Sequence, residues 1–456
     1  MMFLRKYIFL DLFAFLLLFI FTIIYISESF IDIKIPIILQ FIFILLLFFQ
    51  KRFISYNFLV KLMILFFAAP ILPLYGHLFY KDYDWTWLQF QRENLTNMID
   101  LKITLIGLIG ILSIYISQII TRVNQIKTLP FNYPSKNSLG FLNFIFLLIL
   151  SLFCSYLSAP ANTIFEGAYY SFVSVKFFNF PNFNAGFLIS YIILIFLYLD
   201  IERDYSKSRF FKKLLWYTIF FIIVIFLQIL RGDREFIGLI LCLILVNVYK
   251  PIRIKTTTAN NNRLIIKKVW KYIFYFLFFI ILLLYIGIVR YSAMDGDFLI
   301  TGLFLAAPWN MATLSFLAFF ATDISQSYTY GLSYLNYMLS LLPTFFYKIL
   351  NIDSPTWNEN LAAKLVDTNL TSGGAHVALI SISNFGIIGL IIIIFFYTYF
   401  AHKIEKLAIE KGSKYLLIWI GIICALPFWF WYGEMAVIRG VMTAYLLYYS
   451  LNYKLK

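Results

Sequence analysis

Long apolar runs alternate with shorter polar segments along the whole chain. An α-helix needs about 20 apolar residues to cross a bilayer core, and most of these runs come close to that length. The pattern predicts an all-α, polytopic integral membrane protein with about twelve transmembrane helices, which form a single transmembrane domain over residues 1–456. The predicted spans cover residues 8–27, 35–50, 57–76, 103–120, 140–159, 186–199, 214–230, 236–249, 272–289, 385–401, 415–432 and 440–452.

The composition agrees with a membrane protein and excludes several other classes. Hydrophobic residues make up 62% of the chain and charged residues only 13%, whereas a soluble domain has about 25% charged residues. A soluble fold cannot hide so much apolar surface, which excludes a soluble enzyme, a nucleic-acid-binding domain and a disordered chain. Cys154, Cys242 and Cys424 all lie inside apolar runs, so we expect no disulfide framework and no metal site. Nucleotide-binding motifs are absent, and no cofactor is predicted.

The distribution of charge predicts the orientation of the chain. When the spans alternate from a cytoplasmic N-terminus, the inner segments have a net charge of +20 and the outer segments a net charge of −5. An excess of Lys and Arg in cytoplasmic loops is the normal pattern in membrane proteins. We therefore expect both termini in the cytoplasm.

The longest predicted outer loop, residues 290–384, precedes the tenth span. A loop of that length is expected to have order of its own. Two of its pieces, residues 299–320 and 331–349, are apolar enough to cross the membrane. The connector between them contains Asp323 and no Lys or Arg, which favours interfacial or re-entrant helices. The alternative is fourteen spans with the same orientation of the termini.

Arg231 and Arg234 lie in a short hairpin at the predicted outer end of two spans. Charged groups are expensive at membrane depth and usually face a cavity or a partner. Two guanidinium groups at this interface could bind a pyrophosphate, because guanidinium pairs with phosphate oxygens in a bidentate manner. The alternative is an ordinary hairpin whose arginines pair with Asp233 and Glu235 and reach the headgroups.

His376 follows Gly373 and Gly374 and is the one histidine on the predicted outer side close to the start of a span. Imidazole can act as a general base or bind phosphate near neutral pH. Asn384 lies two helical turns further on, on a stretch with several small polar residues. The alternative for His376 is a hydrogen-bonded histidine at the membrane interface.

Two stretches of the sequence resemble a known family. Leu230-Arg231-Gly232-Asp233-Arg234 lies where the bacterial O-antigen polymerases (Wzy-type) place an arginine-containing turn. His376 together with Ser383-Asn384-Phe385-Gly386-Ile387-Ile388-Gly389-Leu390 resembles the stretch that opens a late helix in that family. The likeness extends more distantly to O-antigen ligases. The chain departs from the pattern because Ser383, not an acidic residue, precedes the Asn-Phe-Gly string, and because Thr301, not glycine, stands eleven residues after Arg290.

The resemblance implies a glycosyltransferase of the bacterial inner membrane that works at its periplasmic face. Such an enzyme transfers a growing glycan from undecaprenyl pyrophosphate to a new lipid-linked repeat unit, without a metal ion, in the synthesis of lipopolysaccharide. The implied partners are the lipid-linked oligosaccharide, membrane lipid and a chain-length regulator protein, and no nucleic acid. Its implied catalytic residues are His376, Arg231 and Arg234, and its implied substrate-binding residues are Arg290, Asn384, Tyr169, Tyr170 and Trp309.

Two rival classes remain open. A flippase for lipid-linked oligosaccharides has a similar number of helices, although such transporters usually show a repeat between two halves, which this sequence lacks. A ligase-like or other lipid-dependent glycosyltransferase is the second rival. Glycosyltransferases that place acidic residues in the first outer loop keep Glu28 and Asp32 in consideration.

Overall fold

The computed structural model describes a large part of the chain, and every structural statement below concerns this part. The described residues are 7–50, 58–68, 97–121, 139–158, 186–201, 207–230, 236–249, 315–316, 318–320, 329–339, 361, 364–365, 375–432 and 434–454. They form helices and turns and contain no strand. The chain divides into two compact units, each of which is described by itself.

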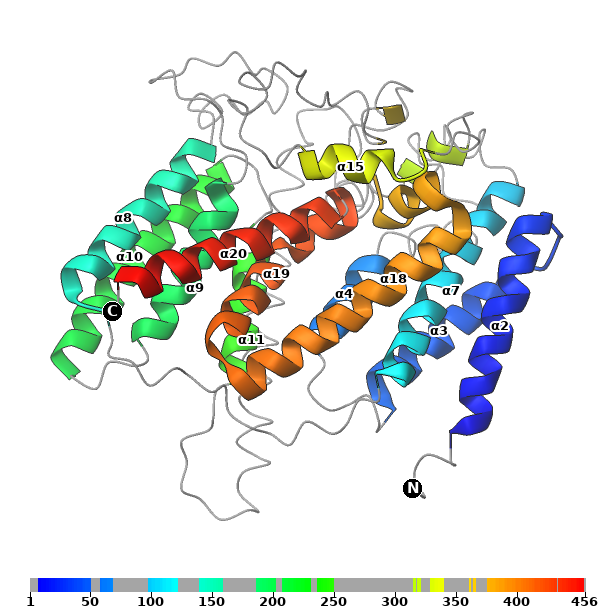
Figure 1. Ribbon diagram of the computed structural model, residues 1–456, viewed down its shortest axis with the longest axis horizontal. Coiled ribbons are helices and arrows are strands. Elements are labelled where there is room, and N and C mark those ends of the chain that lie inside the picture. The colour runs from blue at the N-terminus through cyan, green and yellow to red at the C-terminus, as the bar shows by residue number, and fades with distance from the viewer. Residues whose placement is uncertain are drawn as a thin grey trace, which may run out of the picture. The chain divides into compact units, whose positions relative to one another are not determined.

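The first unit is built around one buried helix (Figure 1). Helix α7 (Asn97–Ile120) packs against α2 (Ile8–Ser27), α3 (Lys34–Phe49) and α4 (Phe58–Ala68). A helix that is apolar on all sides is expected to be enclosed by its neighbours, and 89% of the apolar stretch of α7 is buried. The unit also contains the short helix α15 (Leu332–Leu339) and most of α18 (Val377–Lys411), and Figure 1 shows α15 beside the start of α18.

The second unit is organised around α9 (Gly186–Ile201), which packs against α8 (Phe141–Ser158), α10 (Lys207–Leu230) and α11 (Ile237–Tyr249). It also contains most of α19 (Ser413–Tyr432) and α20 (Glu434–Lys454).

A buried ion pair joins three elements of the second unit. The Lys213 ammonium lies 2.8 Å from the Asp200 carboxylate, and their side chains are only 1% and 3% exposed. The same carboxylate accepts a hydrogen bond from the Leu139 N–H, and the ammonium donates to the Leu139 carbonyl, both at 2.8 Å. Each buried charge is therefore both paired and hydrogen-bonded, as a buried ion requires.

The outer faces of α2 and α10 are apolar. Only 17% and 22% of their apolar stretches are buried, and Phe9, Leu12, Phe19, Leu215 and Phe226 are all more than half exposed. Within the described residues four helices are long and apolar enough to cross a membrane: Ile8–Ser27, Met98–Ile120, Ser208–Gln228 and Val377–Lys411. Exposed apolar faces on helices of this length are the pattern of a helical membrane protein.

The predicted apolar runs coincide with helices wherever the structure describes them, so the all-α class is confirmed. Eleven of the twelve predicted runs overlap a described helix, and the run 272–289 lies outside the described residues. Several helices extend beyond their apolar runs, since α7 begins at Asn97 and α10 at Lys207. The number of membrane crossings, the side on which residues 290–384 lie and the orientation of the termini stay predictions.

Candidate functional site

The predicted motif Asn384-Phe385-Gly386 forms a break inside α18. Phe385 has φ −138° and ψ 18°, and Gly386 has φ 66° and ψ −164°. The backbone conformation of Gly386 is open essentially to glycine alone, which explains the residue type at this point. From Ile387 to Lys411 the helix continues, and at 1.5 Å per residue this part alone is long enough to cross a bilayer core of about 30 Å.

Gly389 supplies the space that the break needs. A Cβ atom at this position would lie 2.5 Å from the Cβ of Phe385 and 3.0 Å from the Ser381 carbonyl oxygen. Any side chain here would therefore force the Phe385 segment to move. The two glycines of the motif have separate structural roles, one in backbone conformation and one in close approach.

The Asn384 side chain is the centre of a polar network at the break. Its Oδ1 accepts hydrogen bonds from the Thr329 hydroxyl (2.9 Å), the Gly331 N–H (3.1 Å) and the Ser333 hydroxyl (2.9 Å). Its Nδ2 donates to Ser333 Oγ (2.6 Å) and to the Ile380 carbonyl (2.7 Å). The amide thus uses its full hydrogen-bonding capacity within the protein. A role for Asn384 in substrate binding stays a prediction, and it needs one of these bonds to be exchanged.

The network fastens the start of α15 to the first part of α18. The Thr329 N–H donates to the Ser383 carbonyl at 2.8 Å, in addition to the bonds of Asn384. A carbonyl freed by a helix break needs another donor, because an unpaired carbonyl at membrane depth is costly. The loop before α15 provides that donor, so the break and the loop stabilise each other.

His376 is fully buried and caps the N-terminus of α18. Its Nδ1 accepts a hydrogen bond from the Ala378 N–H at 3.2 Å, and its Nε2 therefore carries the ring proton and donates to the Phe67 carbonyl, also at 3.2 Å. The His376 N–H donates to the Ser315 hydroxyl at 3.3 Å. The rings of Phe67 and Phe316 pack against the imidazole at centroid distances of 5.3 Å and 4.8 Å.

This environment holds the imidazole in its neutral form. Burial lowers the pKa of His376 from 6.5 to about 3, because the imidazolium would lose its water, and the Phe67 carbonyl opposes only part of this shift. His376 precedes the long helix that begins at Val377. Both ring nitrogens are occupied by the protein, so general-base catalysis by His376 stays a prediction that needs the Ala378 hydrogen bond to open.

Within the first unit, α18 also contacts the start of α4. Both carboxylate oxygens of Glu405 accept from the Leu59 N–H, at 3.2 Å and 3.3 Å, at the N-terminus of α4. A carboxylate is stabilised at a helix N-terminus by the unpaired N–H groups there. His402 lies one turn earlier on α18 and is buried.

The acidic residues of the first predicted outer loop have local partners. Glu28 forms an ion pair with Lys102 at 2.5 Å. Asp32 accepts a hydrogen bond from the Lys34 N–H at 2.9 Å, at the start of α3. Both carboxylates have ordinary local contacts, which add nothing in favour of a glycosyltransferase that uses Glu28 and Asp32 in catalysis.

Six predicted site residues lie outside the described part of the chain: Arg231, Arg234, Arg290, Tyr169, Tyr170 and Trp309. The structure therefore does not test whether the arginines approach the break in α18. Of the predicted site residues, it places Asn384 on the short first segment of α18 and His376 directly before that segment. Within the described ranges no group of three or more His, Cys, Asp or Glu could hold a metal ion.

Sequence reasoning missed the partners of these two residues. Thr329, Gly331 and Ser333 contact Asn384 from more than 50 positions away, and Phe67 contacts His376 from 309 positions away. The Tyr330-Gly331 pair was the available signal, because glycine beside hydroxyl residues is typical of a tight entry into a helix.

Comparisons with protein-family models, with curated proteins and with solved structures find no match to this chain. What the fold supports is the class, a helical protein with apolar helices suited to a membrane. The likeness to the polymerases rests on the residues quoted above alone.

Proposed function

We propose that this protein is an O-antigen-type repeat-unit polymerase at the periplasmic face of the bacterial inner membrane. In this reaction a hydroxyl oxygen of the acceptor repeat unit attacks the anomeric carbon of the growing glycan. The bond from that carbon to the pyrophosphate oxygen breaks, a glycosidic bond forms, and the hydroxyl proton passes to a base. Undecaprenyl pyrophosphate leaves with the bonding electrons, so no nucleotide or metal ion is required.

The observation that carries the proposal is the break in α18 at the motif that resembles one in the polymerases. The Asn-Phe-Gly string is built into a supported interruption, with Asn384 anchoring the loop before α15 and Gly386 in a conformation open to glycine. Non-helical backbone inside a membrane helix is tolerated where protein or a water-filled cavity surrounds it, and such backbone is common at binding sites. The motif thus has the form of a site and not of a simple membrane anchor.

Within this proposal the predicted residues divide into two groups. Arg231 and Arg234 would hold the pyrophosphate and stabilise the negative charge that develops on it. Asn384 holds the helix break and His376 caps the start of α18, and proton transfer by His376 would follow the opening of its Ala378 bond. Arg290, Tyr169, Tyr170 and Trp309 are the further predicted contacts to substrate.

A flippase for lipid-linked oligosaccharides is the second candidate, and the same break favours it. Transporters often build their substrate sites from discontinuous helices. In the part of the chain described here, the buried charges Asp200, Lys213 and Glu405 lie close to helix ends and are held by backbone groups or each other. This arrangement is more typical of structural anchoring than of a transport pathway.

Deletion of the gene in the source bacterium separates the candidates. A polymerase deletion should leave lipopolysaccharide with one repeat unit and no ladder on a gel, and the plasmid-borne gene should restore the ladder. Loss of every repeat unit would instead indicate a flippase or a ligase. Deletion of a flippase should leave lipid-linked units on the cytoplasmic leaflet, whereas deletion of a ligase should leave them on the periplasmic leaflet.

A further inference from the structure

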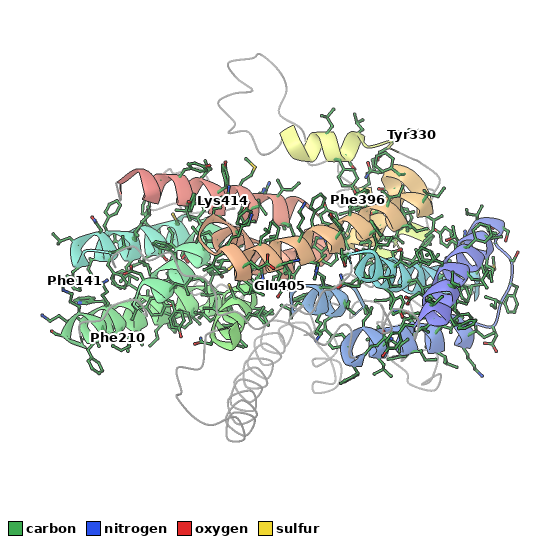
Figure 2. The ribbon with its side chains drawn as sticks, turned by 60° about the horizontal axis from the view of Figure 1, so that its bottom comes forward. Phe141, Phe210, Tyr330, Phe396, Glu405 and Lys414 are labelled. Atoms are coloured by element: carbon green, nitrogen blue, oxygen red, sulfur yellow. The ribbon has the colours of Figure 1, made fainter. Side chains whose placement is uncertain are left out.

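Two aromatic rings stack at the break in α18, beside a third that is exposed. The rings of Tyr334 and Phe385 have centroids 6.1 Å apart and an interplanar angle of 10°. Phe385 is 51% exposed, and Tyr330, in the turn before α15, is 82% exposed. Figure 2 labels Tyr330 beside the first part of α18, away from the Glu405 end.

The backbone under these rings is held in unusual conformations. Tyr330 has φ 46°, a left-handed conformation that is uncommon for a residue with a side chain, and Gly331 follows with φ 86°. Such a conformation persists only where the surroundings impose it. Here the Gly331 N–H and the Thr329 hydroxyl on either side of Tyr330 both donate to Asn384 Oδ1.

The Phe385 ring lies against the turn that contains Tyr330 and Gly331. A Cβ atom at Gly331 would lie 2.9 Å from the ring's Cζ, so the absence of a side chain there lets the ring lie against the turn. Gly389 gives the same freedom on the other side, as described above. Two glycines and the Asn384 network thus fix the position of Phe385 and the backbone of Tyr330, and both of these side chains are more than half exposed.

We propose that Tyr330, Tyr334 and Phe385 form an aromatic platform that binds sugar rings of the lipid-linked glycan by stacking. This inference rests on the proposed polymerase function and assigns a glycan subsite to residues outside the predicted set. A pyranose ring presents a flat face of C–H groups of about the size of an aromatic ring, and the negative face of an aromatic ring attracts those C–H groups.

The fixed geometry favours a sugar over a lipid tail as the occupant. Lipid chains adapt to any apolar surface and gain nothing from a ring held in one orientation. The rest of α18 shows this ordinary surface, because Ile388, Ile392, Phe396 and Phe400 are each about half exposed along one side with no strained backbone beneath them. A rigid ring ligand, in contrast, benefits from a pre-oriented partner, because less freedom is lost on binding.

The test compares ring-removing and ring-keeping substitutions in the full-length protein. The deletion strain receives wild type, Phe385→Leu, Phe385→Tyr, Tyr330→Leu or Phe396→Leu, with protein levels matched by immunoblot. Phe396 is the matched control, because it is on the same helix and is also 51% exposed. The lipid-linked repeat unit extracted from the deletion strain then serves as substrate for each purified variant in nanodiscs.

We expect Phe385→Leu and Tyr330→Leu to raise the KM for the lipid-linked unit about two- to tenfold with kcat little changed, as loss of a ring contact predicts. Both should shorten the chains on the gel. Phe385→Tyr and Phe396→Leu should behave as wild type. The platform is refuted if Phe385→Leu matches wild type, which would indicate a lipid-facing surface, or if Phe385→Tyr is as defective as Phe385→Leu. If the wild-type gene itself fails to restore the ladder, the proposed polymerase function is refuted, and this result differs from the two outcomes that refute the platform alone.

Discussion

Replacement of Asn384 by alanine should loosen the attachment of α15 to α18 without unfolding the rest of the first unit. The substitution removes the acceptor of the Gly331 N–H and one partner of each hydroxyl of Thr329 and Ser333. The Thr329 hydroxyl keeps a bond of 3.3 Å to the Ser383 carbonyl, so only part of the network is lost. A buried group left without a partner costs about 1–3 kcal/mol. We therefore expect the local stability of α15 to fall by about 2–4 kcal/mol.

Hydrogen exchange of the protein in nanodiscs measures this directly. A loss of about 2–4 kcal/mol corresponds to roughly 30- to 1,000-fold faster exchange, which should be confined to residues 329–339. Asn247→Ala is the matched control, because it removes an amide that bonds Tyr198 and the Leu243 carbonyl in the second unit. Unchanged exchange in α15 after Asn384→Ala would refute the anchoring role, and so would equal acceleration by Asn247→Ala.

Three further predictions concern other positions. His376→Asn keeps a hydrogen-bond acceptor at the helix cap but does not titrate. Folding lowers the pKa of His376 to about 3, so the stability that the neutral ring contributes is complete above the unfolded pKa near 6.5 and is lost as pH falls from there toward 3. The melting temperature of the wild type should therefore fall more steeply than that of the variant between pH 7 and pH 5. Equal slopes would contradict the buried neutral ring. Lys213→Met removes the cation of a buried ion pair and should lower the free energy of unfolding by about 3–5 kcal/mol in detergent melts. Lys212→Met, at the exposed neighbouring position, should have little effect. Equal melting temperatures for the two variants would disprove the pairing. Gly389→Ala places a methyl group 2.5 Å from the Cβ of Phe385 and should shorten the glycan chains at normal protein level; a full-length ladder would show that the break tolerates the change.

The helices of this protein could be predicted from the sequence because the lipid bilayer imposes a simple rule. Each run of apolar residues must satisfy its backbone within the run, so apolar length predicts a helix. Helices α2, α3 and α8 begin and end within one residue of their predicted runs. Helix ends such as those of α7 and α10 were harder to predict, because polar residues continue a helix beyond its apolar stretch.

The contacts of the candidate site could not be predicted in the same way. Helix periodicity reports neighbours three or four positions apart, whereas Asn384 meets its partners across more than 50 positions and Glu405 meets Leu59 across 346. The sequence indicated His376 through its place before a span, whereas the break at Gly386 falls at the start of a predicted span and was not predicted. That His376 caps the helix depends on Phe67 and Ser315, which no local pattern connects to it.

The buried pair Asp200–Lys213 shows a related limit. Both residues lie in a predicted cytoplasmic segment with several charges, where ordinary solvation is the usual expectation. In the structure the two side chains are almost fully buried and also bond the backbone of Leu139. Nothing in the sequence distinguishes Lys213 from Lys212, because the difference arises from which side of α10 faces α8 and α9.

Reconstitution of the purified protein with its substrate tests the central proposal most directly. The protein in nanodiscs is supplied only with lipid-linked repeat units, without nucleotide sugars, and the products are analysed by mass spectrometry. The account predicts lipid-linked glycans of two and more repeat units, with one undecaprenyl pyrophosphate released for each new glycosidic bond. Single repeat units that remain unjoined, with no undecaprenyl pyrophosphate released, would contradict it.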